Sequence, residues 1–306
     1  MSTSLQSSPA EPQNAALVGA GLVLTAGLCF SLAGLFMRWM EAADAWQVLI
    51  YRSAATLVFV LCVLAWRNGG SPLPAIRALG WKGPFAGAAL ASAMMLFIVA
   101  LTLTTVFNTV MMICIAPILT AMLARLVLGE AVRRITILAM LIALVGVGIM
   151  VHSGLESGDL LGNLLSLLAA SSFAVFAVTL RAARVQDTMP AVAWAGLIGL
   201  SVSLSIVLIE GNSPFISLQD FGLASAMGAL QIGVGMVFFT AGAKRLTAAE
   251  ATLLSLSEVV LAPIWVWLVL GETPTETTLV GGAVLLGAMI LQASTGLKRR
   301  PPVGLV

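Results

Sequence analysis

Residues 239–272 read FTAGAKRLTAAEATLLSLSEVVLAPIWVWLVLGE, and residues 97–130 read FIVALTLTTVFNTVMMICIAPILTAMLARLVLGE. The two stretches align without a gap at an offset of 142, which matches the run Leu126–Glu130 with Leu268–Glu272. Beyond them, three residues recur at an offset of 143, namely Phe30, Arg38 and Asp44 as Phe173, Arg181 and Asp187. The pattern predicts a duplicated unit of about 143 residues.

The composition excludes a water-soluble domain. Of the 306 residues, 60% are hydrophobic and 9% are charged, so a soluble fold of this size would expose large apolar patches. The three cysteines lie inside apolar runs, which argues against a disulfide framework. No glycine-rich phosphate loop is present, which excludes an ATP-driven pump. We therefore expect a polytopic membrane protein that does not hydrolyse ATP.

Apolar runs of membrane-spanning length recur along the chain after a short tail. Residues 1–14 are rich in Ser, Gln and Pro, which is typical of disorder. Because a helix needs about 20 apolar residues to cross a bilayer, the runs predict ten helices, which make an all-α membrane protein. These are Leu17–Met37, Trp46–Trp66, Pro84–Thr104, Phe107–Leu128, Ile135–Val151, Leu160–Arg181, Ala191–Ile209, Phe221–Ala243, Ala248–Leu270 and Thr278–Gly296.

The number of helices in each unit decides how the two units are related. We expect a first five-helix repeat over residues 15–153, a second over 154–297 and a basic tail over 298–306. Because five is odd, the second unit enters the membrane upside down relative to the first. The fold expected is therefore two inverted five-helix repeats.

Basic residues predict the orientation. Thirteen of the 15 Lys and Arg residues lie in or beside the loops on one side of the predicted membrane, whereas the other side has Arg38. By the positive-inside rule, both termini are expected to be cytoplasmic.

The sequence Leu-Gly-Glu ends the fourth helix of each unit, at residues 128–130 and 270–272. With the segment SEVVLAP at residues 257–263, where Val259 stands in place of a proline, this pattern resembles the EamA-type branch of the drug/metabolite transporter superfamily. The resemblance implies a central cavity lined by the first, third, fourth, sixth, eighth and ninth helices. In length, short tails and Met-rich and Ser-rich middle helices, the chain is similar to the YddG-type exporters of aromatic and other amino acids in bacterial inner membranes.

Glu258 is the main candidate for substrate binding. It is expected near the middle of the membrane, where an acid should face a cavity or be protonated. It would bind a substrate ammonium group or carry a proton, or else make a hydrogen bond between helices. Thr252 and Ser255 share its helix face, and Gln231, followed by two glycines, offers a donor and an acceptor.

Other residues are candidates for the walls and hinges of the cavity. Flexible thioethers suit varied side chains and aromatic rings suit apolar ones, although each residue could equally be core packing. Pro117 and Pro263 each remove a backbone hydrogen bond and are candidate bending points of a gate. Arg52 is expected to pair with Asp44, Glu41 or a carbonyl near the outer surface. The wall candidates are Met94, Met111, Ser172, Phe176 and Phe30.

The sequence as a whole predicts a secondary transporter that exports amino acids by alternating access. The alternative within the class is a multidrug or metabolite exporter, and the alternative outside it is an intramembrane enzyme. The single histidine, His152, sits at a helix edge and the aspartates sit in or beside loops, so an enzyme is not expected. We expect no cofactor, metal or nucleic acid, a membrane lipid environment, and a monomer; the proton is a candidate coupling ion.

Overall fold

The computed structural model describes residues 10–129, 134–157, 159–183, 185, 187–246, 254 and 257–297. Every regular element in these ranges is a helix. In chain order they are α1 (Ala10–Ser31), α2 (Ala33–Arg38), α3 (Ala45–Arg67), α4 (Leu73–Ala78), α5 (Lys82–Leu103), α6 (Val106–Ile113), α7 (Ala116–Leu128), α8 (Arg134–Ser157), α9 (Leu160–Ala182), α10 (Met189–Ile209), α11 (Leu218–Ala226), η1 (Met227–Val234), α12 (Gly235–Ala243), α14 (Ser257–Leu270) and α15 (Glu276–Leu297).

Several of these helices are long and apolar enough to cross a membrane. Seven segments of the described chain meet that standard, with mean hydropathies of 1.6 to 2.3, and three shorter apolar helices accompany them. The chain is therefore a multi-pass membrane protein. The seven segments are Leu17–Arg38, Ala45–Arg67, Lys82–Leu103, Val106–Leu128, Leu160–Ala182, Met189–Ile209 and Leu218–Ala243.

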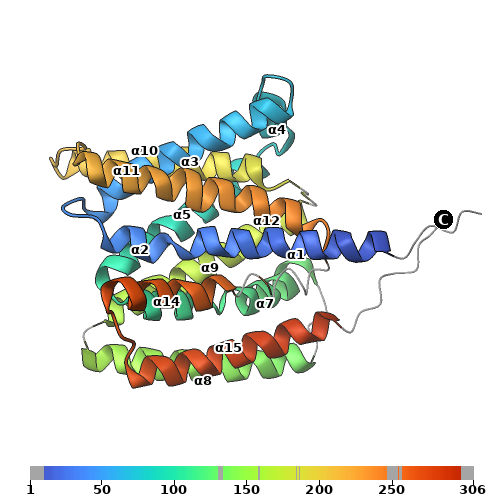
Figure 1. The fold of residues 1–306 in the computed structure, drawn as a ribbon, viewed down its shortest axis with the longest axis vertical. Helices are drawn as coiled ribbons and strands as arrows, with labels where there is room; N and C mark the ends of the chain where they lie inside the picture. The colour runs from blue at the N-terminus through green and yellow to red at the C-terminus, as the bar shows by residue number, and fades with distance from the viewer. Residues whose placement is uncertain are drawn as a thin grey trace, which may run out of the picture.

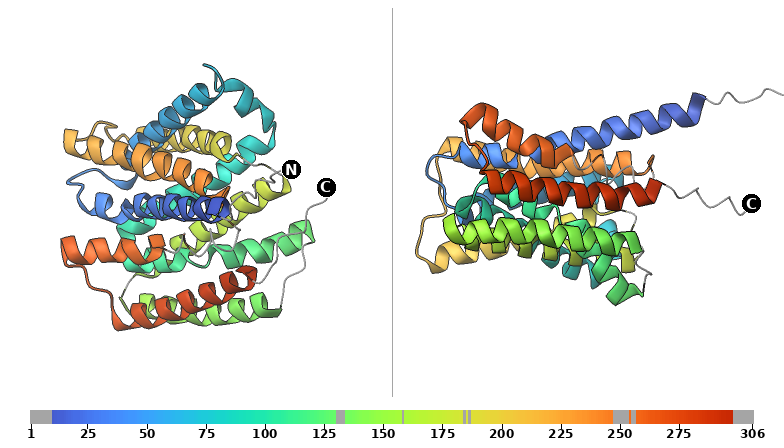
Figure 2. Two further views of the ribbon diagram at one scale, coloured as in Figure 1. Left: turned by 45° about the vertical axis from the view of Figure 1, so that its right-hand side comes forward. Right: turned by 90° about the horizontal axis from the view of Figure 1, so that it is seen from below.

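The helices form one bundle and run roughly along a common direction (Figure 1). The start of α1 and the end of α15 lie at the same end of the bundle (Figure 2). We call the end where α2 stops and α3 starts the Arg38 end, and the opposite end, where α3 stops, the Arg67 end. These two names are used below in place of a membrane side.

At one edge of the bundle, α8 and α15 lie side by side (Figure 1). A Cβ on Gly146 of α8 would meet the Gly281 carbonyl and Leu285 of α15, so the absence of a side chain lets the two helices approach closely. Their other faces expose large apolar residues, among them Leu141 and Val280. Such faces suit lipid.

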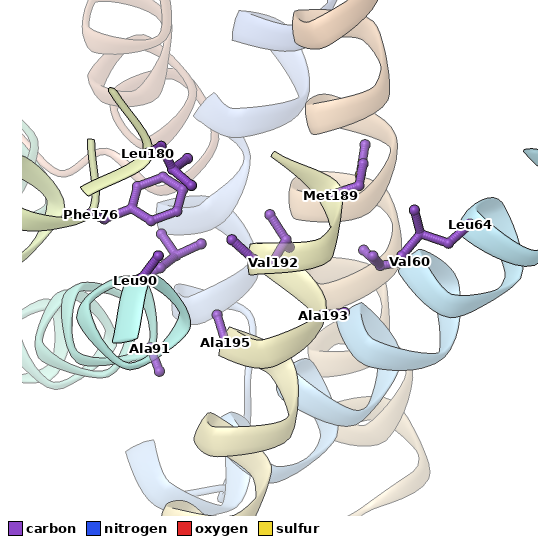
Figure 3. Packing of buried hydrophobic residues seen from close by; sticks show 12 residues of the cluster. Val60, Leu64, Leu90, Ala91, Phe176, Leu180, Met189, Val192, Ala193 and Ala195 are labelled. Carbon is purple, nitrogen blue, oxygen red and sulfur yellow. The ribbon is translucent and has the colours of Figure 1, made fainter. Parts of the chain in front are cut away.

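The core between the helices is apolar. In one cluster, Phe176 and Leu180 of α9 point toward Leu90 of α5 and Val192 of α10, and Val60 and Leu64 of α3 lie beyond α10 (Figure 3). Trp194 of α10 occupies the space that side chains at Gly83 and Gly87 of α5 would need. This packing holds α3, α5, α9 and α10 together.

The observed helices differ from the predicted ones in three places. The first helix begins at Ala10 rather than Leu17, so the predicted tail of residues 1–14 is helical over its last five residues, and residues 1–9 lie outside the described chain. A short helix, α4, occupies the loop after α3, with a proline in its first turn. The first and fourth predicted helices are each interrupted, as described next.

Candidate functional site

The first membrane segment breaks at Leu32, between α1 and α2. The Leu32 N–H donates to the Cys29 carbonyl at 3.3 Å and the helix resumes with Phe36 N–H donating to Leu32 at 3.0 Å. Beside the break, Gln231 Nε2 donates to the Phe30 carbonyl at 3.4 Å. The break thus places backbone polar groups within reach of side chains from other segments.

Gln231 lies in η1, a π-helical turn in the segment that continues as α12. The side chain is 3% exposed, and its Oε1 has no hydrogen-bond partner. Gly235, just after η1, accommodates the Phe30 ring, which would collide with a Cβ there. Wide turns of this kind are frequent at functional sites, so both the Gln231 side chain and its backbone are candidate binding groups.

The fourth segment breaks at Cys114 and Ile115, between α6 and α7. Pro117 occupies the first turn of α7, where proline is tolerated because no helical N–H is lost there. The helix is therefore interrupted just before Pro117. Whether it moves during transport stays a prediction.

The start of α14 lies between these two broken segments. Ser257 contacts α1, because a Cβ on Gly27 would collide with the Ser257 hydroxyl. Glu258 is the next residue, and Val259 after it packs against the cluster that contains Cys114 at the second break. The Ser257 hydroxyl is buried without a hydrogen-bond partner. One turn of α14 thus connects the breaks in the first and fourth segments.

Ser31 completes the polar groups around the first break. Its hydroxyl donates to the Leu28 carbonyl at 2.7 Å and accepts from the indole Nε1 of Trp265 at 3.0 Å. We use the name break site for Gln231, Ser31, Ser257, Glu258 and Cys114. Of these five, the sequence singled out only Gln231 and Glu258. The other three are small residues in apolar runs, and the one available signal was that Ser257 adjoins Glu258.

The predicted wall residues fall in different surroundings. Met111 of α6 is 7% exposed and fills the space beside Gly282 of α15. Phe176 is 4% exposed and belongs to the apolar cluster of Figure 3, against which Met94 packs. Ser172 is half-buried on α9. Met111 and Phe176 are thus core residues, and the contact of any predicted wall residue with substrate remains a prediction.

Some predicted residues cannot be placed. Thr252 and Ser255 lie outside the described residues. Pro263 lies within α14, but its side chain is outside the description. The expectation that Glu258 shares a face with Thr252 and Ser255 therefore stays a prediction.

Two hollows are present at the ends of the bundle. One, of about 260 Å³, is lined by α4, Trp81, Lys82 and the residues after α9 at the Arg67 end. The other, of about 210 Å³, is lined by Gln47, Phe215 and Asp220 at the Arg38 end. Neither adjoins Glu258. Among the described residues, no group of three or more His, Cys, Asp or Glu side chains could hold a metal ion.

The Arg38 end is closed by polar contacts between the two halves of the chain. Arg38 Nε lies 3.1 Å from Glu272 Oε2, and Glu272 Oε1 accepts from the Val106 N–H at 3.1 Å. Asp220 accepts from the backbone N–H groups of residues 41–43. In addition, Thr278 donates to Asn108 at 2.6 Å. These contacts link α2, α6, α11, α14 and α15.

Comparison with known proteins identifies the class. The model of the EamA-like transporter family matches residues 17–152 and again residues 160–293. The chain is 31% identical over 212 residues to an uncharacterized transporter of Synechocystis sp., covering 65% of this chain and 61% of the relative. It is 26% identical over 198 residues to an uncharacterized transporter of Archaeoglobus fulgidus, covering 64% and 70%. The chain thus matches less than two thirds of the Synechocystis protein's length.

A solved structure shares the fold. One crystal structure aligns over 94% of this chain and 99% of its own, with a TM-score of 0.64 and 19% identity. The family match over most of the chain identifies it as a membrane transporter. More particularly, the chain belongs to the EamA-like transporter family of the drug/metabolite transporter superfamily.

Proposed function

We propose that the protein is a secondary transporter that exports amino acids, aromatic and other apolar ones among them, across the bacterial inner membrane. The observation that carries the proposal is the break site, where Gln231 Oε1 and the Ser257 hydroxyl are both buried without partners and Ser257 directly precedes Glu258. Unsatisfied buried polar atoms are unfavourable in an apolar interior, and a bound polar substrate would satisfy them. Glu258 would bind the substrate ammonium group.

In this proposal, the ten apolar helices form two inverted five-helix repeats that rock about the break site. The termini and the Arg67 end face the cytoplasm, as the distribution of basic residues predicts. The Arg38 end then faces outward. Its polar contacts would hold the outer side closed, and they must separate for the substrate to leave.

A multidrug exporter of the same superfamily is the second candidate. The observation in its favour is that Glu258 is the one acidic side chain of the break site, which suits a simple cation as well as an amino acid. An intramembrane enzyme lacks support, because His152 is exposed near the end of α8.

The test is counterflow in proteoliposomes with a panel of labelled amino acids, with and without a pH gradient. The proposal predicts saturable exchange of apolar and aromatic amino acids by the wild type. Saturable flux of none of them would defeat the amino-acid proposal, and exchange of organic cations alone would favour the second candidate. Insensitivity to pH in both the wild type and Glu258→Gln would remove proton coupling through Glu258.

A further inference from the structure

Arg52 lies well inside the membrane segment formed by α3. It is the eighth residue of this helix, which at about 1.5 Å per residue places its Cα roughly 10 Å from the Arg38 end. The side chain is 2% exposed. An arginine this deep in a membrane helix is rare and normally pairs with an acid or with backbone carbonyls.

The partners expected from the sequence do not bind it. Arg52 Nε and Nη1 are buried without a hydrogen-bond partner. Asp44 caps its own helix, accepting from the Trp46 and Gln47 N–H groups at 2.8 and 2.9 Å. The ion pairs found in the described ranges, Arg38–Glu272 and Arg67–Asp187, leave Arg52 out. The predicted pairing of Arg52 with Asp44, Glu41 or a carbonyl is therefore not found for its Nε and Nη1, and Asp44 is used as a helix cap instead.

The neighbouring elements offer no other free acid. α3 packs on α10, α11, η1 and α5. The sequences of α5, η1 and α10 contain no Asp or Glu, and α11 contains one, Asp220. Both Asp220 oxygens already accept backbone N–H groups from the turn before α3. The preceding turn of α3 is apolar and belongs to a cluster with Leu49, Ile98 and Met227.

The backbone at Arg52 is held closely against η1. A Cβ on Gly228 of η1 would collide with the Arg52 carbonyl, and Thr56 Oγ1 lies 2.9 Å from that carbonyl and 3.1 Å from the Gly228 carbonyl. Three residues after Gly228 comes Gln231, with its unpartnered Oε1. Two helical elements in direct contact, α3 and η1, thus carry unpaired polar atoms. These are the N–H donors of Arg52 on α3 and the Oε1 acceptor of Gln231 on η1.

We infer that Arg52 binds the carboxylate of the transported molecule, so that the substrate class is a small carboxylic acid with an apolar side chain. A guanidinium is always charged and its N–H groups match the geometry of a carboxylate. A buried cation without a partner opposes folding, whereas one that pairs with an incoming anion supplies binding energy. The inference rests on the proposed function, in which the carboxylate of the amino acid has no other partner.

The test compares Arg52→Met and Arg52→Lys with a matched control, Arg67→Met, on the exposed end of the same helix. The probes are 3-phenylpropionate and 3-phenylpropionamide. Binding of each probe is measured as the rise in melting temperature of the purified protein. We expect the carboxylate to stabilise the wild type and R67M, and R52M to weaken its apparent affinity on the order of 10- to 100-fold, as for a lost hydrogen bond to a charged group. R52K should retain part of the response. R52M without ligand should melt at or above the wild-type temperature, because a buried unpaired charge has been removed.

Several results would overturn the inference. These are an equal response of wild type and R52M to the carboxylate, no response of the wild type, or equal stabilisation by the amide. If R52M does not fold, the test is inhibition of phenylalanine counterflow in the wild type by the two probes. Equal inhibition by 3-phenylpropionate and 3-phenylpropionamide would overturn the inference. Absence of phenylalanine counterflow in every variant would defeat the proposal of amino-acid export but not the inference about Arg52. The change in melting temperature with 3-phenylpropionate does not depend on transport.

Discussion

Arg38 and Glu272 form an ion pair, with Nε 3.1 Å from Oε2, that joins the end of α2 to the residue two positions after α14. Arg38 Nη2 also donates to the Thr104 carbonyl at 3.1 Å. The pair therefore ties together the ends of three membrane segments and the start of α6. In the proposed mechanism, it is a lock on the outer side.

Breaking this pair should open the Arg38 end. The side chains are 32% and 20% exposed, so Glu272→Gln is expected to weaken the closed form by only about 1 kcal/mol. The measurement is the labelling rate of a cysteine introduced at the buried Ser31, with a membrane-impermeant maleimide applied from outside. We expect Glu272→Gln to raise this rate severalfold. The double variant R38E/E272R should restore the wild-type rate, and unchanged labelling in Glu272→Gln would remove the lock.

The sequence repeat supplies a second version of that experiment. The repeat mates of Arg38 and Glu272 are Arg181 and Glu130, although Glu130 lies outside the described residues. Inverted repeats place such mates at opposite ends. We expect Glu130→Gln to lower labelling from the outside, because it favours opening of the other end. Equal effects of both variants would contradict the inverted arrangement.

Glu258 should be needed for binding the ammonium group. Loss of one charged hydrogen bond predicts an apparent affinity for phenylalanine about 10- to 100-fold weaker in Glu258→Gln. Exposed Glu210, at the end of α10, provides the matched control Glu210→Gln, which should behave as wild type. Counterflow at increasing phenylalanine concentrations measures the apparent affinity of both variants. Equal affinities in the two variants would leave Glu258 with a packing role.

The contact between α1 and α14 predicts a stability difference between two glycines of the same helix. A Cβ at Gly27 collides with Ser257, whereas a Cβ at Gly21 meets nothing within 4 Å. Gly27→Ala should destabilise the protein by about 1–3 kcal/mol through overpacking. Gly21→Ala should be neutral or stabilising by up to about 1 kcal/mol, because alanine favours helix. Melting temperatures in detergent would show this order, and the reverse order would refute the contact.

The break before Pro117 predicts a kinetic effect. Pro117→Ala makes a continuous helix from α6 to α7 possible, which would stiffen the fourth segment. Transport should slow severalfold while the amount of folded protein and its melting temperature stay near wild type. Unchanged transport would show that the interruption has no part in gating.

Much of the architecture follows from the sequence because a bilayer imposes one strong rule. Apolar runs of sufficient length must be helices, since no water is available to satisfy the backbone. The apolar runs therefore predicted the seven long membrane segments found in the described chain, and the Leu-Gly-Glu pattern predicted the family that the comparison confirmed. The break before Pro117 lies where a bend was expected, because proline starts a helix more readily than it continues one.

The rest depends on contacts between segments, which leave no local signal. The break at Leu32 contains no proline, and only Ser31 and Gly34 beside it hint at a kink. The π-helical turn at Gln231 packs closely against α3 and α1 through Gly228 and Gly235. In the sequence, nothing distinguishes Ser257 from other small residues. Its contact with Gly27 is seen only in the structure. Arg52 was expected to pair with Asp44, Glu41 or a carbonyl near the outer surface, yet its Nε and Nη1 have no partner and Asp44 caps its own helix.

The central claim is that the break site is where substrate binds, and Ser257→Cys tests it most directly. Cys29, Cys62 and Cys114 would first be replaced by alanine in a variant that retains transport. We expect a small maleimide to modify the introduced thiol and this modification to abolish counterflow. A transported amino acid should slow the modification in proportion to its affinity. Modification at the same rate with and without a transported amino acid, or full transport after complete modification, would contradict it.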